Sequence, residues 1–344
     1  MIDLAVTQQA SPAAEIKRLA NGFCHAKLLL AANELGVFAD LHQHGPATEA
    51  ELVERLPLQD RGARELLHGL VLLGLLERED GRYHNSEATT TALIPGGPEY
   101  VGGFLRRADH MLYPAWENLT QALTTGKPQA PGAGPDAFLS MLDDDRQRDQ
   151  FMQMMDSASG RLVDDLAGAF PWDAYRHIAD VGGCRGNLAG QLLKRYPGLG
   201  ATVFDLPPMA APCADHMARL GVADRFRFHV GDFFTDELPA ADVIILGHVL
   251  HDWSPAQRRF LVAKAFQAVN PGGALLVYDA MLTSEPTDLA RILVSINMLL
   301  VTEDGSEYTV DEGRQWFAEA DCTDVQVHPL GQTDTLLVGR KPAT

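Results

Sequence analysis

The stretch Asp180-Val181-Gly182-Gly183-Cys184-Arg185-Gly186 follows an apolar run over residues 177–181 and precedes a helix-forming segment. Small residues between a strand and a helix let the main chain of a tight turn pass close to a ligand. In open parallel sheets, ligands bind at the carboxyl ends of the strands. The stretch therefore predicts an α/β fold whose first strand ends in a ligand-binding turn.

The spacing of the glycines limits which ligand this turn can hold. A dinucleotide fingerprint needs glycines at positions i, i+2 and i+5. Here the glycines stand at 182, 183 and 186, and no frame satisfies that spacing. The turn is thus rich in glycine without being a cradle for a pyrophosphate.

Further short apolar runs alternate with helical segments along the second half of the chain. They cover residues 201–204, 226–230, 243–246 and 274–278. Nearly continuous apolar strands separated by helices predict a parallel sheet that is covered on both faces. The chain closes with apolar runs at 325–327 and 335–338 around a turn at Gly331, which predict an antiparallel hairpin. The expected fold is a Rossmann-like, mostly parallel sheet.

Two more strand ends carry side chains suited to a nucleoside. Asp205 follows the second strand, 19 residues after Gly186, where a carboxylate can accept both hydroxyls of a ribose. Asp232 follows the third strand, and the next two residues, Phe233 and Phe234, can face a purine. Three successive strand ends therefore predict a nucleoside pocket without a phosphate site.

A histidine lies in the loop after the fourth strand, over the same crevice. His251 has a reference pKa near 6.5, so we expect it to be mostly neutral at cytoplasmic pH and able to take a proton. Two carboxylates could orient its ring. Asp279 ends the fifth strand, and Glu307 comes directly before a helix start. These residues predict a proton acceptor beside the nucleoside pocket.

The first hundred residues have a different pattern. An apolar helix is expected over 20–35, a second helix begins at the capping box of Thr48 and Glu51, and a third is capped by Asp60. An Asp80-Gly81 turn then predicts a hairpin. Helices followed by a hairpin are typical of a winged helix. The apolar first helix needs a partner, for which another copy of the chain is the obvious candidate.

Composition excludes several classes of protein. With 28 Lys and Arg against 46 Asp and Glu, the formal charge is -18, so nucleic acid is an unfavoured partner. The four cysteines form no CxxC pair, which suits a reducing cytoplasm better than a disulfide framework or a cysteine zinc site. We read no signal peptide and no stretch near the roughly 18 apolar residues of a membrane span. A cytoplasmic protein is expected.

Taken together, the motifs resemble those of the S-adenosylmethionine-dependent small-molecule O-methyltransferases, which include plant caffeate and flavonoid enzymes and bacterial antibiotic-tailoring enzymes. The resemblance is carried by segments 180–186, 204–207, 231–234, 250–254 and 305–309. It covers nearly the whole chain, because those proteins also begin with a winged-helix-like dimerisation domain. It implies a class I methyltransferase sheet and a homodimer.

The resemblance also implies a division of the chain. Residues 1–98 would form the winged-helix-like dimerisation domain. Residues 99–165 would form a helical connector that contributes to the acceptor pocket, and residues 166–344 would form the catalytic domain that binds S-adenosylmethionine.

The implied cofactor is S-adenosylmethionine, which leaves as S-adenosylhomocysteine, and no metal is expected. The implied contacts are Ser159 for the carboxylate; Gly182, Gly183 and Gly186 for the methionine part; Asp205 for the ribose; and Gly231, Asp232 and Phe233 for the adenine.

The resemblance makes His251 the general base, flanked by Asp279 and Glu307, and a phenolic hydroxyl of a small aromatic molecule the acceptor. The candidates for the acceptor pocket come from the connector, from the turn around the base and from a late helix. They are His110, Met111, Trp116, Met155, Asp252, Asn297 and Met298.

Four positions depart from the family pattern. Cys184 replaces a glycine, which predicts a tighter turn, and Asp279 stands where many members have Glu, which leaves Glu307 as the main orienter. His248, with Gly247 before it, stands where plant members carry Lys-Trp. Ser295 begins a segment that commonly begins with Asp, so the acceptor pocket differs.

Alternative interpretations stay open at this point. The same fold could methylate carbon or nitrogen, and a winged helix could belong to a DNA-binding regulator. His248, His251 and Asp252 could hold a metal, but a spacing of three in a strand-to-loop segment need not bring the two histidines together. Arg106 and Arg107 are expected to be a solvated pair.

Overall fold

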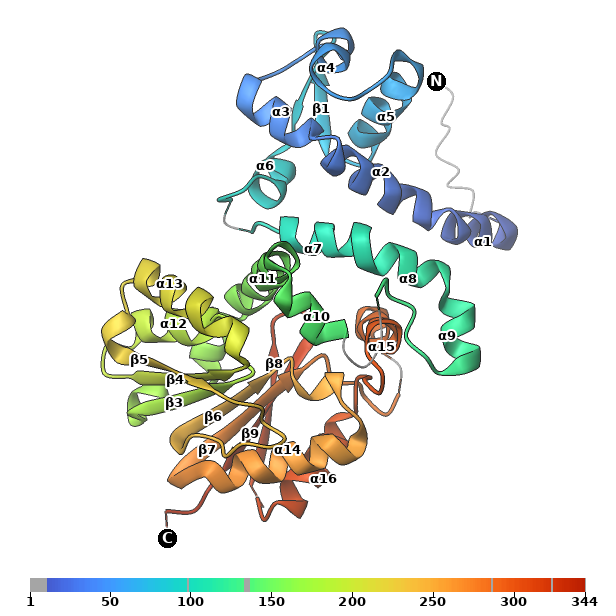
Figure 1. The fold of residues 1–344 in the computed structure, drawn as a ribbon. Coiled ribbons are helices and arrows are strands. Elements are labelled where there is room, and N and C mark those ends of the chain that lie inside the picture. The colour runs from blue at the N-terminus through green and yellow to red at the C-terminus, as the bar shows by residue number, and fades with distance from the viewer. Residues whose placement is uncertain (1–10, 98, 133–136, 286, 323, 344) are drawn as a thin grey trace, which may run out of the picture. The chain divides into compact units, whose positions relative to one another are not determined.

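The computed structural model describes residues 11–97, 99–132, 137–285, 287–322 and 324–343. The chain divides into two compact units, Met1–Arg106 and Arg107–Thr344 (Figure 1). The domain boundaries expected after residues 98 and 165 stay predictions. Among the described residues, helices long and apolar enough to cross a membrane are absent.

Within its described residues, the first unit contains six complete helices and a hairpin, followed by α7 (Gly102–Arg107), whose last residue belongs to the second unit. They are α1 (Pro12–Ala20), α2 (Gly22–Glu34), α3 (Val37–His44), α4 (Glu49–Arg55), α5 (Asp60–Leu72), β1 (Leu76–Glu79), β2 (Arg82–Asn85) and α6 (Glu87–Leu93). The hairpin and the capping box are confirmed: β1 pairs antiparallel with β2, and the Thr48 hydroxyl accepts a hydrogen bond from the main-chain N–H of Glu51. Such a box supplies partners to main-chain donors that the helix leaves free.

The helix predicted over 20–35 is found as α2, and a separate helix, α1, ends before it at Ala20. The third helix differs from its expected form. Asp60 does not cap α5, because Gln59 occupies the cap position and Gly62, with φ +100°, interrupts the helix directly after it. Only glycine adopts that backbone conformation without strain, so the regular helix begins beyond it.

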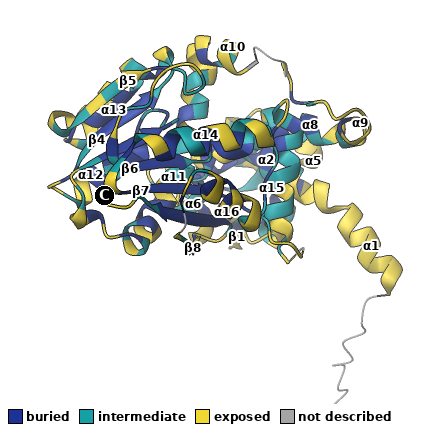
Figure 2. Ribbon diagram, turned by 90° about the horizontal axis from the view of Figure 1, so that it is seen from below, coloured by how far each residue is buried: buried dark blue, intermediate teal, exposed yellow. Residues whose placement is uncertain are grey.

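The helix α1 is exposed along its whole length. It buries none of its residues, and Ile16 and Leu19 leave 69% and 76% of their surface accessible (Figure 2). Phe23, at the start of α2, is also exposed. Neighbouring apolar side chains on a helix surface are typical of an interaction site.

The second unit begins with connector helices and continues into a sheet. After the last residue of α7, its helices are the π-helix η1 (Ala108–Leu112), α8 (Tyr113–Glu117), α9 (Leu119–Thr125), α10 (Ala137–Asp143), α11 (Asp145–Ala169), η2 (Trp172–Ala174), α12 (Asn187–Arg195), η3 (Pro207–Met209), α13 (Ala210–Leu220), η4 (Ala223–Arg225), η5 (Leu250–Asp252), α14 (Pro255–Ala268), α15 (Leu289–Val301) and α16 (Val310–Glu319). Its strands are β3 (His177–Val181), β4 (Gly200–Asp205), β5 (Phe226–Val230), β6 (Ala241–Gly247), β7 (Val269–Asp279), β8 (Val325–Leu330) and β9 (Asp334–Arg340).

The strands form one sheet in the order β5-β4-β3-β6-β7-β9-β8. Neighbours from β5 to β7 are parallel, whereas β9 pairs antiparallel with β7 and with β8. The expected Rossmann-like sheet with a C-terminal antiparallel hairpin is confirmed. Because β3 lies between β4 and β6, the chain order reverses there, and a crevice opens beyond the carboxyl end of β3.

Helices cover both faces of this sheet (Figure 1). In β6, Val243 and Ile245 pack in one core with residues of α11, α12 and α13. The alternate residues Ile244 and Leu246 pack in the other core with residues of α14 and α16. Since successive side chains of a strand point to opposite faces, burial on both sides explains why these strands are apolar throughout.

Truncating a central strand residue should destabilise the fold. Ile245 is fully buried, so Ile245→Ala should lower the free energy of unfolding by about 2–5 kcal/mol through lost burial and a residual cavity. Leu289 is 70% exposed, so the control Leu289→Ala should change it by less than about 0.5 kcal/mol. Equilibrium chemical denaturation measures both, and equal effects would contradict this placement of the core.

Candidate active site

The turn after β3 depends on glycine. Gly182 and Gly186 have φ +73° and +74°, and added Cβ atoms would lie 2.8 Å from Val249 Cγ2 and 2.5 Å from Met217 Cε. Cys184 also has a positive φ, +53°, which is rare for a residue with a side chain. The main chain at this crevice is therefore a tight turn that larger side chains would disrupt.

Asp205, at the end of β4, holds this turn. Its Oδ2 accepts a hydrogen bond of 2.7 Å from the N–H of Cys184, and its Oδ1 accepts one of 2.7 Å from the N–H of Leu206. Burial raises the pKa of Asp205 to about 6. Each carboxylate oxygen has a second lone pair, so the side chain can still accept hydroxyl groups of a ligand.

Ser159 and Met155 line a cavity beside the glycine turn, together with Gly182 and Gly183. The cavity is also lined by Asp180, Asn187 and Tyr278, which were not among the expected site residues, and by His248. Asp180 is buried, burial raises its pKa to about 7, and its Oδ2 has no hydrogen-bond partner among the described residues. A buried carboxylate oxygen without a partner is costly unless a ligand supplies one. The position of Asp180 at a strand end could have marked it.

The end of β5 reaches the same crevice. Oδ1 of Asp232 accepts a hydrogen bond from the N–H of Phe234, which fixes a turn, and the Phe233 ring packs edge-on to Trp253. An added Cβ at Gly182 would lie 3.8 Å from Cε1 of Phe233. The structure therefore brings the residues expected to bind a nucleoside to one place.

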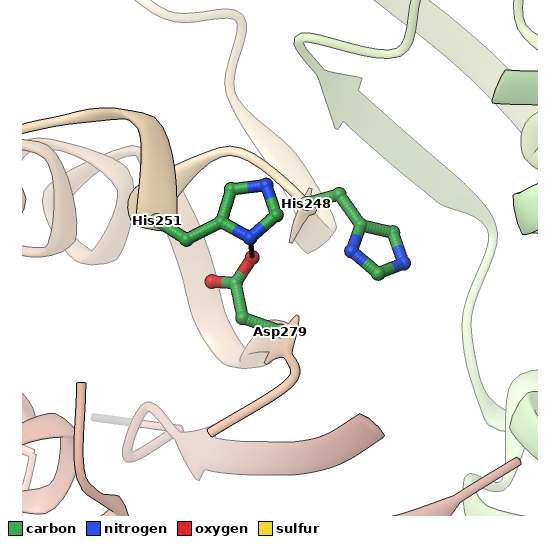
Figure 3. A group of neighbouring side chains, drawn as sticks. All are labelled: His248, His251 and Asp279. Atoms are coloured by element: carbon green, nitrogen blue, oxygen red, sulfur yellow. Dashed lines mark ion pairs between the residues drawn. The ribbon is translucent and has the colours of Figure 1, made fainter. Parts of the chain in front are cut away.

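His251 lies on η5, between β6 and α14, with its side chain buried. Its Nδ1 is 2.6 Å from Oε1 of Glu307. The same atom is 3.5 Å from Oδ1 of Asp279 (Figure 3). The Asp279 carboxylate accepts the hydroxyl of Tyr308 through its other oxygen. Glu307 is therefore the hydrogen-bond partner that orients the ring, and it leaves Nε2 for another partner.

The charges around His251 differ from the sequence expectation. Burial lowers the pKa of His251, but the carboxylates of Asp279, Glu307 and Asp252 outweigh burial and raise it to about 10. Burial also raises the pKa of Asp279 well above its usual value, against the opposing charge of His251. The expectation of a mostly neutral imidazole at neutral pH is therefore wrong for the chain by itself.

His248 lies closer to His251 than its spacing suggested. The ring centroids are 5.6 Å apart, and ligand atoms of His248, His251 and Asp279 lie within 4.8 Å of one another (Figure 3). The left-handed backbone of His248, with φ +53°, accounts for the close approach, and its Nε2 is 3.5 Å from Oδ2 of Asp334. The absence of a resident metal stays a prediction.

Side chains expected to line an acceptor pocket are partly brought together. Nε1 of Trp116 donates a hydrogen bond of 2.7 Å to Oδ1 of Asn297, and Met298 is buried on the same helix, α15. Met111 packs in the cluster that contains Leu300, whereas the side chain of His110 is exposed.

Asp252 and Arg107 are two charged residues that interact with each other near His251. Burial raises the pKa of Asp252, and its Oδ1 is 3.8 Å from Nε2 of His251. Burial lowers the pKa of Arg107, and the charge of Asp252 opposes that shift. The expectation of a solvated arginine pair is therefore wrong for Arg107.

Comparisons with known proteins identify related chains. Residues 116–321 match the family model of an O-methyltransferase domain, and residues 17–94 match that of an O-methyltransferase dimerisation domain. The tetracenomycin polyketide synthesis 8-O-methyl transferase TcmO of Streptomyces glaucescens is 44% identical over 95% of this chain and 96% of its own length. The N,N-dimethyltransferase OxyT of Streptomyces rimosus is 37% identical over 98% of this chain and 99% of its own.

A solved structure has the same fold over nearly its whole length. The human N-acetylserotonin methyltransferase, crystallised in complex with S-adenosylmethionine, is 29% identical, with a TM-score of 0.89 over 98% of this chain and 99% of that one.

Replacing Glu307 by glutamine should bring the pKa of His251 back from about 10 toward 6.5, because the carboxylate at Nδ1 is lost. A pKa raised by folding stabilises the fold below pH 6.5, and that contribution disappears as pH rises to about 10. Glu307→Gln should therefore flatten the decline in stability over this range. NMR titration of the ring and unfolding at pH 6 and 10 measure both.

Glu319 is the matched control, since it is exposed and paired with Arg259. Glu319→Gln should leave the titration of His251 unchanged. An unshifted titration in Glu307→Gln would contradict the assignment of Glu307 as the main partner.

Proposed function

The chain belongs to the O-methyltransferase family, and from this premise we propose that it methylates a phenolic hydroxyl of an aromatic polyketide with His251 as general base. The chain is an S-adenosylmethionine-dependent O-methyltransferase. The acceptor, the base and the residue contacts are the proposal. The observation that carries it is the buried pair of His251 and Glu307 beside the nucleoside crevice.

The crevice fits the cofactor. The turn leaves no room for Cβ atoms at Gly182 and Gly186, and an oxygen of Asp180 at the cavity has no partner within the described part of the chain. We propose that Ser159, with the glycines, holds the methionine part, Asp205 the ribose and the turn of Gly231, Asp232 and Phe233 the adenine. When bound, the cofactor supplies a methyl group on a sulfonium cation.

In its neutral form, which a pKa of about 10 makes the minor one at neutral pH, His251 would take the proton of the acceptor hydroxyl on Nε2, because Nδ1 donates to Glu307. A pKa of about 10 for His251 is close to the ordinary pKa of a phenol, so the transfer of the proton from the phenol to the imidazole is nearly balanced in free energy. The hydroxyl oxygen then gains the electron pair that attacks the methyl carbon. Glu307 fixes the tautomer of the ring and stabilises the imidazolium.

The acceptor pocket is proposed to lie between the connector and α15. Trp116 and Asn297 are hydrogen-bonded across it, and Met298 and Met111 add apolar surface suited to a flat ring. Met155 lies instead at the cavity of the glycine turn, where it would border both ligands. TcmO, named for a step of polyketide synthesis, supports a fused phenolic acceptor.

We also propose a homodimer that forms through the N-terminal domain. Residues 17–94 match a dimerisation domain, and the exposed apolar side chains of Ile16, Leu19 and Phe23 lie on its first two helices. The enzymatic relatives and the acidic chain do not favour a DNA-binding regulator.

Nitrogen methylation is a second candidate function, because OxyT is named as an N,N-dimethyltransferase. An amine that is neutral at working pH already has a free electron pair and needs no base to attack. A buried imidazole oriented by a carboxylate therefore favours a hydroxyl acceptor.

Replacing His251 by glutamine should reduce kcat on the true acceptor by about 10²- to 10⁴-fold, because general-base assistance is lost. Binding of S-adenosylhomocysteine should stay within about threefold of the wild type, since the proposed cofactor contacts are untouched. His42→Ala, at an exposed position of α3, is the control. Turnover that survives in His251→Gln at the wild-type rate would show that His251 is not the base.

The atom that is methylated can be tested with paired acceptors. A polycyclic phenol and the aromatic amine of the same ring system should be distinguished by at least about tenfold in kcat/KM in favour of the phenol, since only the phenol needs the base. Mass spectrometry of the products locates the methyl group. Preference for the amine would favour N-methylation instead.

A further inference from the structure

A buried arginine lies directly behind the candidate base. Arg258, on the second turn of α14, is only 2% exposed. Its guanidinium lies 5.3 Å from the ring centroid of Tyr308 and 5.9 Å from that of Trp316. A buried charge is costly unless it is paired or fully hydrogen-bonded, so its partners matter.

Those partners are main-chain groups on two separate segments. Nε donates a hydrogen bond of 2.9 Å to the carbonyl of Leu250, and Nη2 donates bonds of 2.7 and 3.0 Å to the carbonyl and hydroxyl of Ser306. Leu250 precedes His251, and Ser306 precedes Glu307. The planar guanidinium of Arg258 therefore donates hydrogen bonds to the residue before His251 and to the residue before Glu307.

The two gripped segments also touch each other. The N–H of Ser306 donates a bond of 2.9 Å to the carbonyl of His251. An added Cβ at Gly305 would lie 2.6 Å from that same carbonyl oxygen, so the close approach requires glycine. Arg258 thus adds side-chain hydrogen bonds to two segments whose main chains already contact each other.

We propose that Arg258 is a positioning residue for methyl transfer, whose guanidinium clamps the turn that carries His251 to the segment that carries Glu307. The proposal rests on the proposed function, since it assigns Arg258 a role through that pair. Lysine at this place offers a point charge and no fork, so it cannot bridge both carbonyls in the same way.

The clamp also adds a positive charge to an acidic site. The groups that face His251 are Asp252 on its own turn, Asp279 from β7, Glu307 before α16 and His248 from β6. Behind them, Asp334 of β9 pairs with His248, and Arg107 acts on Asp252. The charges of Arg258, Asp279 and Glu307 also act on one another. Removing that cation should raise the pKa of His251 further.

Two substitutions separate the clamp from the charge. Arg258→Lys keeps the positive charge but loses the planar guanidinium. We expect kcat to fall by about 10- to 100-fold, which is the scale of a displacement of about 1 Å in a catalytic group. The acidic limb of the pH–rate profile should stay unchanged. Arg258→Gln loses both, so kcat should fall at least as far and the acidic limb should move to higher pH. Arg259→Gln, on the neighbouring residue, which is exposed and paired with Glu319, is the control and should match the wild type.

The readouts are kcat, KM for the acceptor, the pH profile, the melting temperature and the Kd of S-adenosylhomocysteine, all on the full-length enzyme. A loss in kcat at nearly unchanged KM and Kd supports the clamp. Wild-type kcat in Arg258→Lys overturns it, and so does a loss that runs parallel to lost folding or lost binding of S-adenosylhomocysteine in both variants. His251→Gln, measured beside these variants, tests the proposed function separately. Full turnover in His251→Gln refutes the assignment of His251 as general base. Full turnover in the Arg258 variants alone refutes only the positioning role of Arg258.

Discussion

The contact between Nδ1 of His251 and Oε1 of Glu307 is the constraint on which the rest of the catalytic unit depends. The two residues are 56 positions apart, yet their side chains meet at 2.6 Å in the interior. Burying a carboxylate and an imidazole costs several kcal/mol unless the pair is held in good geometry. The turn after β6 and the segment before α16 must therefore be placed to within a fraction of an ångström. Gly305 allows the two segments to approach closely, and Arg258 donates hydrogen bonds to both.

Much of the fold was predictable because its signals are local. The strands are buried on both faces, so they are continuous apolar runs, and carboxyl ends of neighbouring parallel strands must meet at one edge. That geometry alone gathers Gly182, Asp205 and Asp232 around one crevice. The start of α5 was less predictable, because Gly62, with its left-handed backbone, interrupts the helix directly after the cap position.

The parts of the site that the sequence did not predict depend on contacts between distant elements. The pKa of His251 is set by carboxylates from three separate segments, so its reference value gave the wrong protonation state. The approach of His248 follows from a left-handed backbone at a residue with a side chain. Arg258, next to a capping box and followed by Arg259, has the pattern of a solvated helix residue, yet the rings of Tyr308 and Trp316 and the segments of Leu250 and Ser306 pack against it.

The division of labour within the site explains how related chains can differ in the atom they methylate. TcmO and OxyT, whose names give different acceptor atoms, are 44% and 37% identical to this chain over nearly its whole length. The choice of acceptor atom therefore need not involve the crevice of the glycine turn, where we propose that the cofactor binds. In this chain the proposed acceptor side comes from elements outside the sheet: Trp116 on α8, Asn297 on α15, and Arg107, whose charge acts on Asp252. Such helices can exchange side chains without disturbing the strand ends, so the acceptor can change while the placement of His251 is kept.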